Sequence, residues 1–208
     1  MTRDASKVYF LPADSISADN IVRIFDAAGF SSLFKSGDLV AIKVHFGEPG
    51  NKAYLKPENV RPLAQKLKDL GTKPFLTDAN TLYKGKRSNS VDHIETAHSH
   101  GYDFLPVVIA DGLNGKDFEK VRINGKHFKE VNIGSAAVQA DAILVMTHFK
   151  GHELTGFGGA IKNLGMGLGS RSGKQQMHAD VKPLVQKDAS IGCGLCVKWC
   201  RQRYQHGK

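Results

Sequence analysis

The chain has 208 residues, 41% of them apolar, which is enough to bury one hydrophobic core. No apolar run is long enough to cross a bilayer, and the first residues lack the apolar stretch of a secretory signal, so we expect a cytoplasmic protein without a membrane partner. The formal charge is +9, and residues 142–208 hold ten Lys and Arg against three acids. Because these basic residues are not interleaved with aromatic ones, we expect small anions or acidic proteins as partners, and not nucleic acid.

Short apolar runs and amphipathic stretches alternate along the chain. The apolar runs predict strands over residues 7–11, 38–44, 73–77, 106–110 and 142–147. Between them, Ser17 and Ser90 suit helix N-caps, Pro57 suits the first turn of a helix, and a short helix is expected over 135–140. Alternating residues on both sides of Asn124-Gly125 predict a β-hairpin.

This order of elements predicts an α/β fold. Strands that alternate with helices form right-handed crossovers, so we expect a mostly parallel open sheet with helices on both faces, plus the one hairpin. We divide the chain into an α/β core domain over residues 1–187 and a short segment over 188–208, which holds all three cysteines.

Polar loops follow three of the predicted strands. Ligands of open α/β sheets bind outside the carboxyl ends of the strands, so these loops are the candidates for a site. The first loop begins at His45, the second contains Asp78, and the third runs from Thr147 to Ser170. We expect His45 and Asp78 to take part in catalysis from loops that neighbour the third.

The third loop is rich in glycine and leads from a strand into a helix. Glycine allows close approach of the backbone, and such a turn directs unpaired N–H groups toward an anion. We therefore expect a cofactor near Gly156, Gly158 and Gly159, with Lys162 one turn into the helix to complete the cradle. The alternative is a glycine-rich turn that packs on the sheet and leaves Lys162 in solvent.

Three histidines accompany this loop. Neutral imidazole binds transition metals and also moves protons near neutral pH. We expect His152 and His178 to bind a metal or transfer protons, and His148 and Lys150 to contact the cofactor, although each histidine taken singly also fits a hydrogen-bonded structural role. Three other histidines lie on an ordinary amphipathic helix and are expected at the surface or in packing: His93, His98 and His100.

Three motifs in these loops are long and specific. They read V-H-F-G-E-P-G-N at 44–51, T-D-A-N-T-L-Y-K-G-K-R at 77–87 and H-F-K-G-H-E-L-T-G-F-G-G-A-I-K-N-L-G-M-G at 148–167. With them the chain resembles domain of unknown function 362 over residues 5–190. In that family a ferredoxin-like iron–sulfur module often follows the core, so the resemblance implies an iron–sulfur cluster and a ferredoxin-type electron carrier as partner, without naming a reaction.

A shorter stretch is similar to the nickel-pincer lactate racemases. Those enzymes carry a His and, ten residues later, a Lys that tethers a nicotinate-derived cofactor; a further His, sixteen residues on, binds nickel. His152, Lys162 and His178 are spaced in the same way. The resemblance implies one pocket shared by these three residues and a transition metal such as nickel, zinc or iron.

The three cysteines form a single cluster. Their spacing matches half of the bacterial ferredoxin run C-x2-C-x2-C-x3-C-P, with Ser190 in the first cysteine position and Arg201 in place of the proline. Cys193, Cys196 and Cys200 are the expected iron–sulfur ligands, but they are too few for a cube. Three interpretations stay open: a lapsed or truncated module, a three-cysteine cluster with an external or serine ligand, and a zinc site completed by a histidine.

Three functions fit these features. The first is an enzyme whose core binds a metal or an anionic or nucleotide-derived cofactor for redox or proton-transfer chemistry, either an oxidoreductase or a cofactor-dependent isomerase. The second is a ferredoxin-type electron-transfer protein with a 4Fe–4S module. The third is a non-catalytic module that binds an anion or a partner through its basic half.

Overall fold

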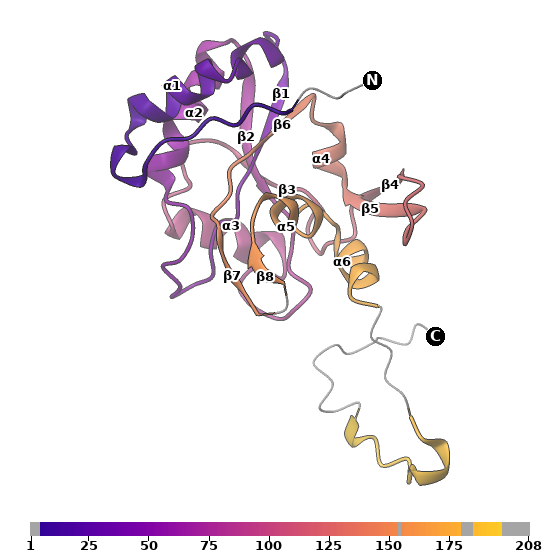
Figure 1. The fold of residues 1–208 in the computed structure, drawn as a ribbon. Helices are drawn as coiled ribbons and strands as arrows, with labels where there is room; N and C mark the ends of the chain where they lie inside the picture. The colour runs from indigo at the N-terminus through magenta and orange to yellow at the C-terminus, as the bar shows by residue number, and fades with distance from the viewer. Residues whose placement is uncertain (1–4, 154, 180–184, 197–208) are drawn as a thin grey trace.

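The computed structural model describes residues 5–153, 155–179 and 185–196 (Figure 1). Its centre is a four-stranded sheet in the order β3-β2-β1-β6, in which all neighbours are parallel. The strands are β1 (Leu39–Lys43), β2 (Lys73–Asp78), β3 (Val107–Ile109) and β6 (Ala142–Val145). With helices flanking this sheet and a separate hairpin, the predicted fold class is confirmed.

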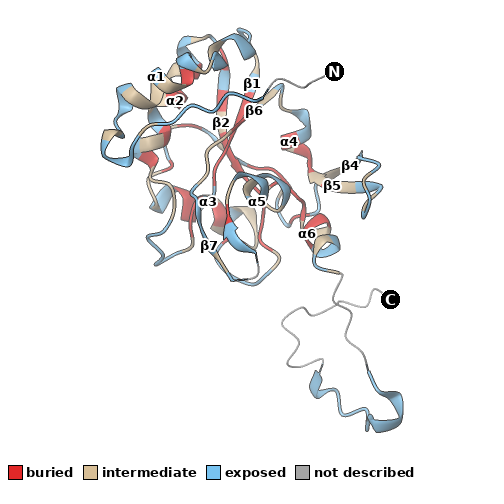
Figure 2. Cartoon of the chain, viewed as in Figure 1, coloured by how far each residue is buried: buried red, intermediate tan, exposed pale blue. Residues whose placement is uncertain are grey.

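Three helices cover one face of the sheet. Alternate strand residues point toward them, so Ile42, Leu76 and Leu144 share a buried core with Phe25 and Leu67 of the helices (Figure 2). Figure 1 shows two of these helices side by side on one flank of the strands. The three are α1 (Ala18–Ala27), α2 (Pro57–Asp69) and α3 (Ser90–Ser99).

The helix starts follow the expected chemistry, with one correction. The side chain of Ser17 accepts a backbone N–H from the first turn of α1, and Pro57 is the first residue of α2. The cap of α3 is Asn89 and not Ser90, because the Asn89 side chain accepts the N–H of Asp92 at 3.0 Å. An amide oxygen caps a helix as well as a hydroxyl does.

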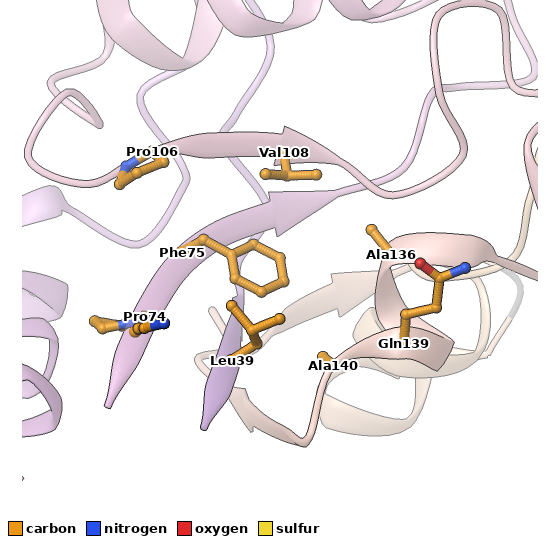
Figure 3. Close-up of a pocket in the computed structure, with 9 residues that line it drawn as sticks. Leu39, Pro74, Phe75, Pro106, Val108, Ala136, Gln139 and Ala140 are labelled. Atoms are coloured by element: carbon orange, nitrogen blue, oxygen red, sulfur yellow. The ribbon is translucent and has the colours of Figure 1, made fainter. Parts of the chain in front are cut away.

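The opposite face of the sheet is covered only in part. The helix α4 (Ser135–Gln139) packs there beside a pocket of about 360 Å³, in which Phe75 lies between the strands and Ala136 (Figure 3). Two residues of this face, Leu39 and Val108, are 48% and 39% exposed. One face of the sheet is therefore core, and the other is open at its amino-terminal end.

Two antiparallel hairpins lie outside the sheet. The first is the predicted one, but its turn is longer than the Asn124-Gly125 pair, because the N–H groups of Ile123 and Asn124 both donate to the carbonyl of Lys129. The second was not predicted, because its strands are three residues long and rich in glycine. The paired strands are β4 (Phe118–Arg122) with β5 (Glu130–Gly134), and β7 (Lys150–His152) with β8 (Gly156–Gly158).

The first predicted strand, over residues 7–11, is wrong. Val8 and Phe10 are 88% and 81% exposed, and no described strand pairs with this run. An apolar pattern alone does not make a strand, since its backbone groups need a neighbouring strand. None of the described helices is both long and apolar enough to cross a membrane. The remaining elements are η1 (Ala13–Ser15), η2 (Phe30–Leu33), α5 (Ala160–Gly165), α6 (Arg171–Met177) and η3 (Lys187–Ala189).

Two isoleucines in adjacent strands compare the covered face with the open one. Ile42 is 0% exposed and Ile143 is 39% exposed. We expect Ile42→Ala to lower the free energy of unfolding by about 2–5 kcal/mol and Ile143→Ala by less than about 1.5 kcal/mol, because only the first opens a cavity in the core. Urea unfolding followed by circular dichroism measures both. Equal losses would contradict the open face.

Candidate functional site

A buried ion cluster lies at the carboxyl ends of the two central strands. Lys43 is the last residue of β1 and Asp78 the last residue of β2, so the parallel register brings both to the same edge. The Nζ of Lys43 lies 3.0 Å from Asp78 Oδ1, and Nη1 of Arg87 lies 3.0 Å from Asp78 Oδ2. All three side chains are at most 4% exposed. One carboxylate therefore holds two cations away from water.

The guanidinium of Arg87 also holds the surrounding loops. Its Nε donates to Glu48 Oε1 at 2.9 Å, and its Nη2 contacts the same carboxylate, the Tyr83 hydroxyl and Nε2 of His45. The Tyr83 hydroxyl in turn donates to Glu48 Oε1 at 2.5 Å. Together with Asp78, these partners occupy the guanidinium and tie the loop after β1 to the loop after β2.

Asp78 stays ionised inside this cluster. Burial alone would raise the pKa of its carboxyl, but the charges of Lys43 and Arg87 outweigh burial and hold the pKa well below its ordinary range. The side chain is 3% exposed, and both of its oxygens are paired with cations. The structure thus places Asp78 as the central counter-ion, and its catalytic role stays a prediction.

His45 lies at the rim of the cluster with a donor beside each ring nitrogen. The N–H of Gly47 points at Nδ1 from 3.0 Å, and Nη2 of Arg87 lies 3.1 Å from Nε2. A protonated imidazole would present N–H groups to both donors, which disfavours the charged form. Although the residue is exposed overall, the atoms packed around the ring lower its pKa to about 4; the charge of Asp78 opposes this shift, and that of Arg87 adds to it. The surroundings of His45 therefore favour the neutral ring.

The side chain of His93, in α3, lies beside the same cluster. Its ring is fully buried edge-on against Phe46, and its Nε2 lies 3.8 Å from Asp78 Oδ2, beyond hydrogen-bond distance. Neither ring nitrogen has a hydrogen-bond partner among the described residues. Burial lowers the pKa of His93 to about 4; Arg87 and His45 add to this effect, and Asp78 opposes it.

A second buried polar group lies one strand further along. Asp111 follows β3, and its Oδ1 accepts hydrogen bonds from the backbone N–H and the side-chain amide of Asn80 at 2.8 and 2.9 Å. Asp111 Oδ2 and Asn80 Oδ1 are buried and accept no hydrogen bond from the part of the chain that the structure describes. Burial raises the pKa of Asp111. Lys174 of α6 is buried nearby, where it donates to the Gly169 carbonyl at 2.5 Å, and burial lowers its pKa to about 8.

Lys162 and His152 meet where the glycine-rich segment passes from β8 into α5. The Nζ of Lys162 contacts Nε2 of His152. Both side chains pack over Gly158, where an added Cβ would lie 3.6 Å from Lys162 Cδ and 4.0 Å from His152 Cδ2. Burial and the charge of Lys150 lower the pKa of Lys162. The structure thus brings together two of the three residues predicted to share a pocket.

The other predicted residues of this segment are placed less closely. His148 and Lys150 are exposed, and so is His178, the C-cap residue of α6, whose ring forms no hydrogen bond within the described residues. Gly156 has a φ of +75°, which suits the turn between β7 and β8, and Gly159 is the N-cap residue of α5. A metal bound by His152 and His178 and a backbone cradle for an anion stay predictions.

The described residues do not fit a metal or an iron–sulfur cluster as they stand. Across the described ranges, no group of three or more His, Cys, Asp or Glu side chains is arranged to hold a metal ion. Cys193 and Cys196 are exposed in a turn in which Gly192 and Gly194 have φ of +65° and +71°. Cys200 lies outside the described residues. Two thiolates fall short of the four that a cube needs.

Comparison with known proteins places this site in a family. The family model described as "Domain of unknown function (DUF362)" matches residues 40–196. The chain belongs to this family. The matched region contains the ion cluster and the glycine-rich segment, so both lie within the part of the chain that defines membership.

The chain also matches a curated protein. The chain is 25% identical over 141 residues to the thylakoid-associated protein sll1697 of Synechocystis sp.. The match covers 65% of the chain but 41% of the relative, so the chain spans less than half of that protein. No solved structure matches the chain.

Sequence reasoning missed the cations that build the cluster, Lys43 and Arg87. A usable signal for Lys43 was present, because a lysine that ends an otherwise apolar strand needs a counter-charge at the same edge of the sheet. Asp78 ends the next strand, one residue beyond Thr77, which is the register partner of Lys43. Arg87 carried no comparable signal, since it lies nine residues after Asp78 in a loop whose path the sequence does not fix.

The burial of His93 predicts a specific loss of stability in acid. Its folded pKa of about 4 lies below the ordinary value near 6.5, so the unfolded chain binds the proton first as pH falls. Stability is then complete above about pH 6.5 and is lost toward pH 4 by up to about 1.4 kcal/mol per pH unit. Glutamine at this position does not titrate, so we expect His93→Gln to flatten this slope.

Urea unfolding at a series of pH values measures the slope. The matched control is His98→Gln, which removes an exposed histidine from the same helix and should leave the slope as in the natural chain. A His93→Gln slope equal to that of the control would show that His93 is protonated in the folded state.

Proposed function

We propose that the chain binds a small anionic ligand at the β7–β8 hairpin and the start of α5, through Lys150, His152 and Lys162. The contact between the Lys162 ammonium and the His152 ring is the observation that carries the proposal. A cation and an imidazole that touch each other also form a donor and acceptor pair, which can pass a proton to or from a bound acid.

The lack of a local counter-charge supports this assignment. None of the ion pairs among the described residues includes Lys150 or Lys162. Lys43 and Arg87, by contrast, are already paired with carboxylates. Like charges held close together favour a ligand of opposite charge. A phosphate or a carboxylate has the required chemistry.

The pair suits an acid–base role. Lys162 and His152 can donate and accept a proton at defined atoms, Nζ and Nε2. A cofactor-dependent isomerase is the enzyme class that agrees best with this chemistry, and a module that only binds anions is the simpler alternative.

Binding of inorganic phosphate tests the proposal. We expect Lys162→Ala to weaken the affinity for phosphate about tenfold, because one hydrogen bond to a charged group is worth about 1.5 kcal/mol. Isothermal titration calorimetry at low ionic strength measures the affinity. Lys116→Ala is the control, since it removes the same charge from an exposed side chain that forms no ion pair among the described residues. If both variants bind phosphate equally, the assignment to Lys162 fails.

An iron–sulfur electron carrier is the second candidate function. It is favoured by the turn over residues 192–196, in which two left-handed glycines leave both described thiols exposed on one loop. This function requires further thiolates, from Cys200 and from a partner protein.

Metal analysis of the purified protein decides this candidate. If the chain carries electrons, we expect iron and acid-labile sulfide in stoichiometric amounts with visible absorbance, and their loss in Cys193→Ser. Zinc in equal amount to protein would favour the zinc site instead. A colourless preparation without iron, made under anaerobic conditions, would reject the electron carrier and leave the anion-binding proposal unaffected.

A further inference from the structure

Asn163, the residue next to Lys162, is held by three hydrogen bonds on the inner side of α5. Its Oδ1 accepts from the Nζ of Lys43 at 2.6 Å. Its Nδ2 donates to the Met146 carbonyl at 3.1 Å and contacts the Thr147 hydroxyl at 3.0 Å. The amide is therefore bound to β1 through Lys43 and to the end of β6 through the other two groups.

The helix that carries Lys162 and Asn163 is too short to hold its own position. α5 has six residues, and a helix of this length is unstable without tertiary contacts. At its end, Gly167 lies directly against Lys43, since an added Cβ would stand 2.7 Å from both Cε and Nζ. The end of α5 therefore packs directly against the buried ammonium of Lys43.

We propose that Asn163 and Lys43 are positioning residues that fix Lys162 against His152. The inference rests on the proposed function, because that function gives the contact between Lys162 and His152 its role. The contact itself can be tested without a ligand. Asp78 holds the Lys43 ammonium at 3.0 Å, Lys43 holds Asn163, and one peptide bond connects Asn163 to Lys162. The orientation of the exposed lysine is therefore set by a charge at the centre of the sheet.

The arrangement also explains why a lysine occupies this buried position in β1. An apolar residue would pack as well against the strands, but it could not bond both Asp78 and the Asn163 amide. The ammonium has three donors and supplies both bonds from one atom. Lys43 thereby joins a fixed strand to a helix that has little stability of its own.

The test measures the nuclear Overhauser effect between the Lys162 side chain and the His152 ring in the labelled full chain. We expect this signal in the natural protein and its loss in Asn163→Ala, which frees α5 from both strands. Ile161→Ala is the matched control, because Ile161 lies on the same helix and is 90% exposed. In the control the signal should equal that of the natural chain.

A purely structural role for Asn163 would lower the thermal midpoint and leave the signal in place, so a folded Asn163→Ala that retains it overturns the proposal. Absence of the signal from the natural chain would overturn it too. If Asn163→Ala does not fold, Thr147→Val decides in the same way, since it removes one of the three bonds with nearly the same side-chain volume. There we expect the signal to weaken but to persist, and an unchanged signal would contradict the proposal.

Phosphate affinity separates this inference from the function on which it rests. If positioning matters for binding, Asn163→Ala should weaken phosphate about tenfold, or about 1.4 kcal/mol. Loss of the Overhauser signal with unchanged phosphate affinity would uphold the positioning role and reject the anion site. Loss of affinity with an intact signal would reject the positioning role alone.

Discussion

A carboxylate buried at the centre of a sheet must keep its cations, and this constraint organises the carboxyl edge of the fold. Removing an ion from water costs several kcal/mol, so Asp78 is tolerated only because Lys43 and Arg87 contact it from opposite sides. Each cation has further donors to satisfy. Lys43 uses one on Asn163, and Arg87 uses its others on the loop after β1. Three separate segments are thus tied to one charge.

Burial divides the lysines of this edge into two kinds. Lys43 and Lys174 are buried, and each has a fixed acceptor in the protein. Lys150 and Lys162 are exposed and have no carboxylate partner among the described ion pairs. The first kind holds the backbone in place, and the second is available to a ligand. Residue type alone does not separate them, because the difference lies in which donors are already used.

Much of the sheet could be predicted from the sequence, because β1, β2 and β6 are short apolar runs between helices with clear end signals. The cap at Asn89 and the length of the first hairpin's turn could not be predicted. In each case neighbouring residues suit the same role, and the sequence does not show which of them takes it. The strand expected over 7–11 failed for a different reason. A hydrophobic pattern indicates that a segment can be buried. Whether it forms a strand also depends on a neighbouring strand with which to pair, and the pattern does not show that strand.

The candidate site was predicted less well than the sheet, and for a physical reason. The resemblance to the racemases implied one pocket for His152, Lys162 and His178. The structure brings the first two into contact, because ten residues suffice for a hairpin that returns to a helix, and the shared pocket stays a prediction. The contacts of Lys43 with Asp78 and Asn163 span 35 and 120 residues. The strand-ending lysine indicates that Lys43 needs a counter-charge, but nothing local in the sequence indicates its contact with Asn163. The chemistry of such a site can be read from a motif, but the groups that orient it come from the fold.

The glycines of the third loop have a second use beside the one that their sequence suggests. A cradle for an anion would need glycine near residues 156–159, but the tightest contacts lie further on. A Cβ at Gly167 would meet the carbonyl of Asn163 at 2.0 Å as well as Lys43, and one at Gly173 would meet the carbonyl of Asn132 at 2.3 Å. These glycines allow α5 and α6 to pack directly onto buried polar groups. Within the loop, Gly167 is thus required by the packing on Lys43, whereas a Cβ at Gly151, Gly156 or Gly165 would meet nothing within 4 Å. The close packing at Gly167 fixes the end of the helix that carries Lys162.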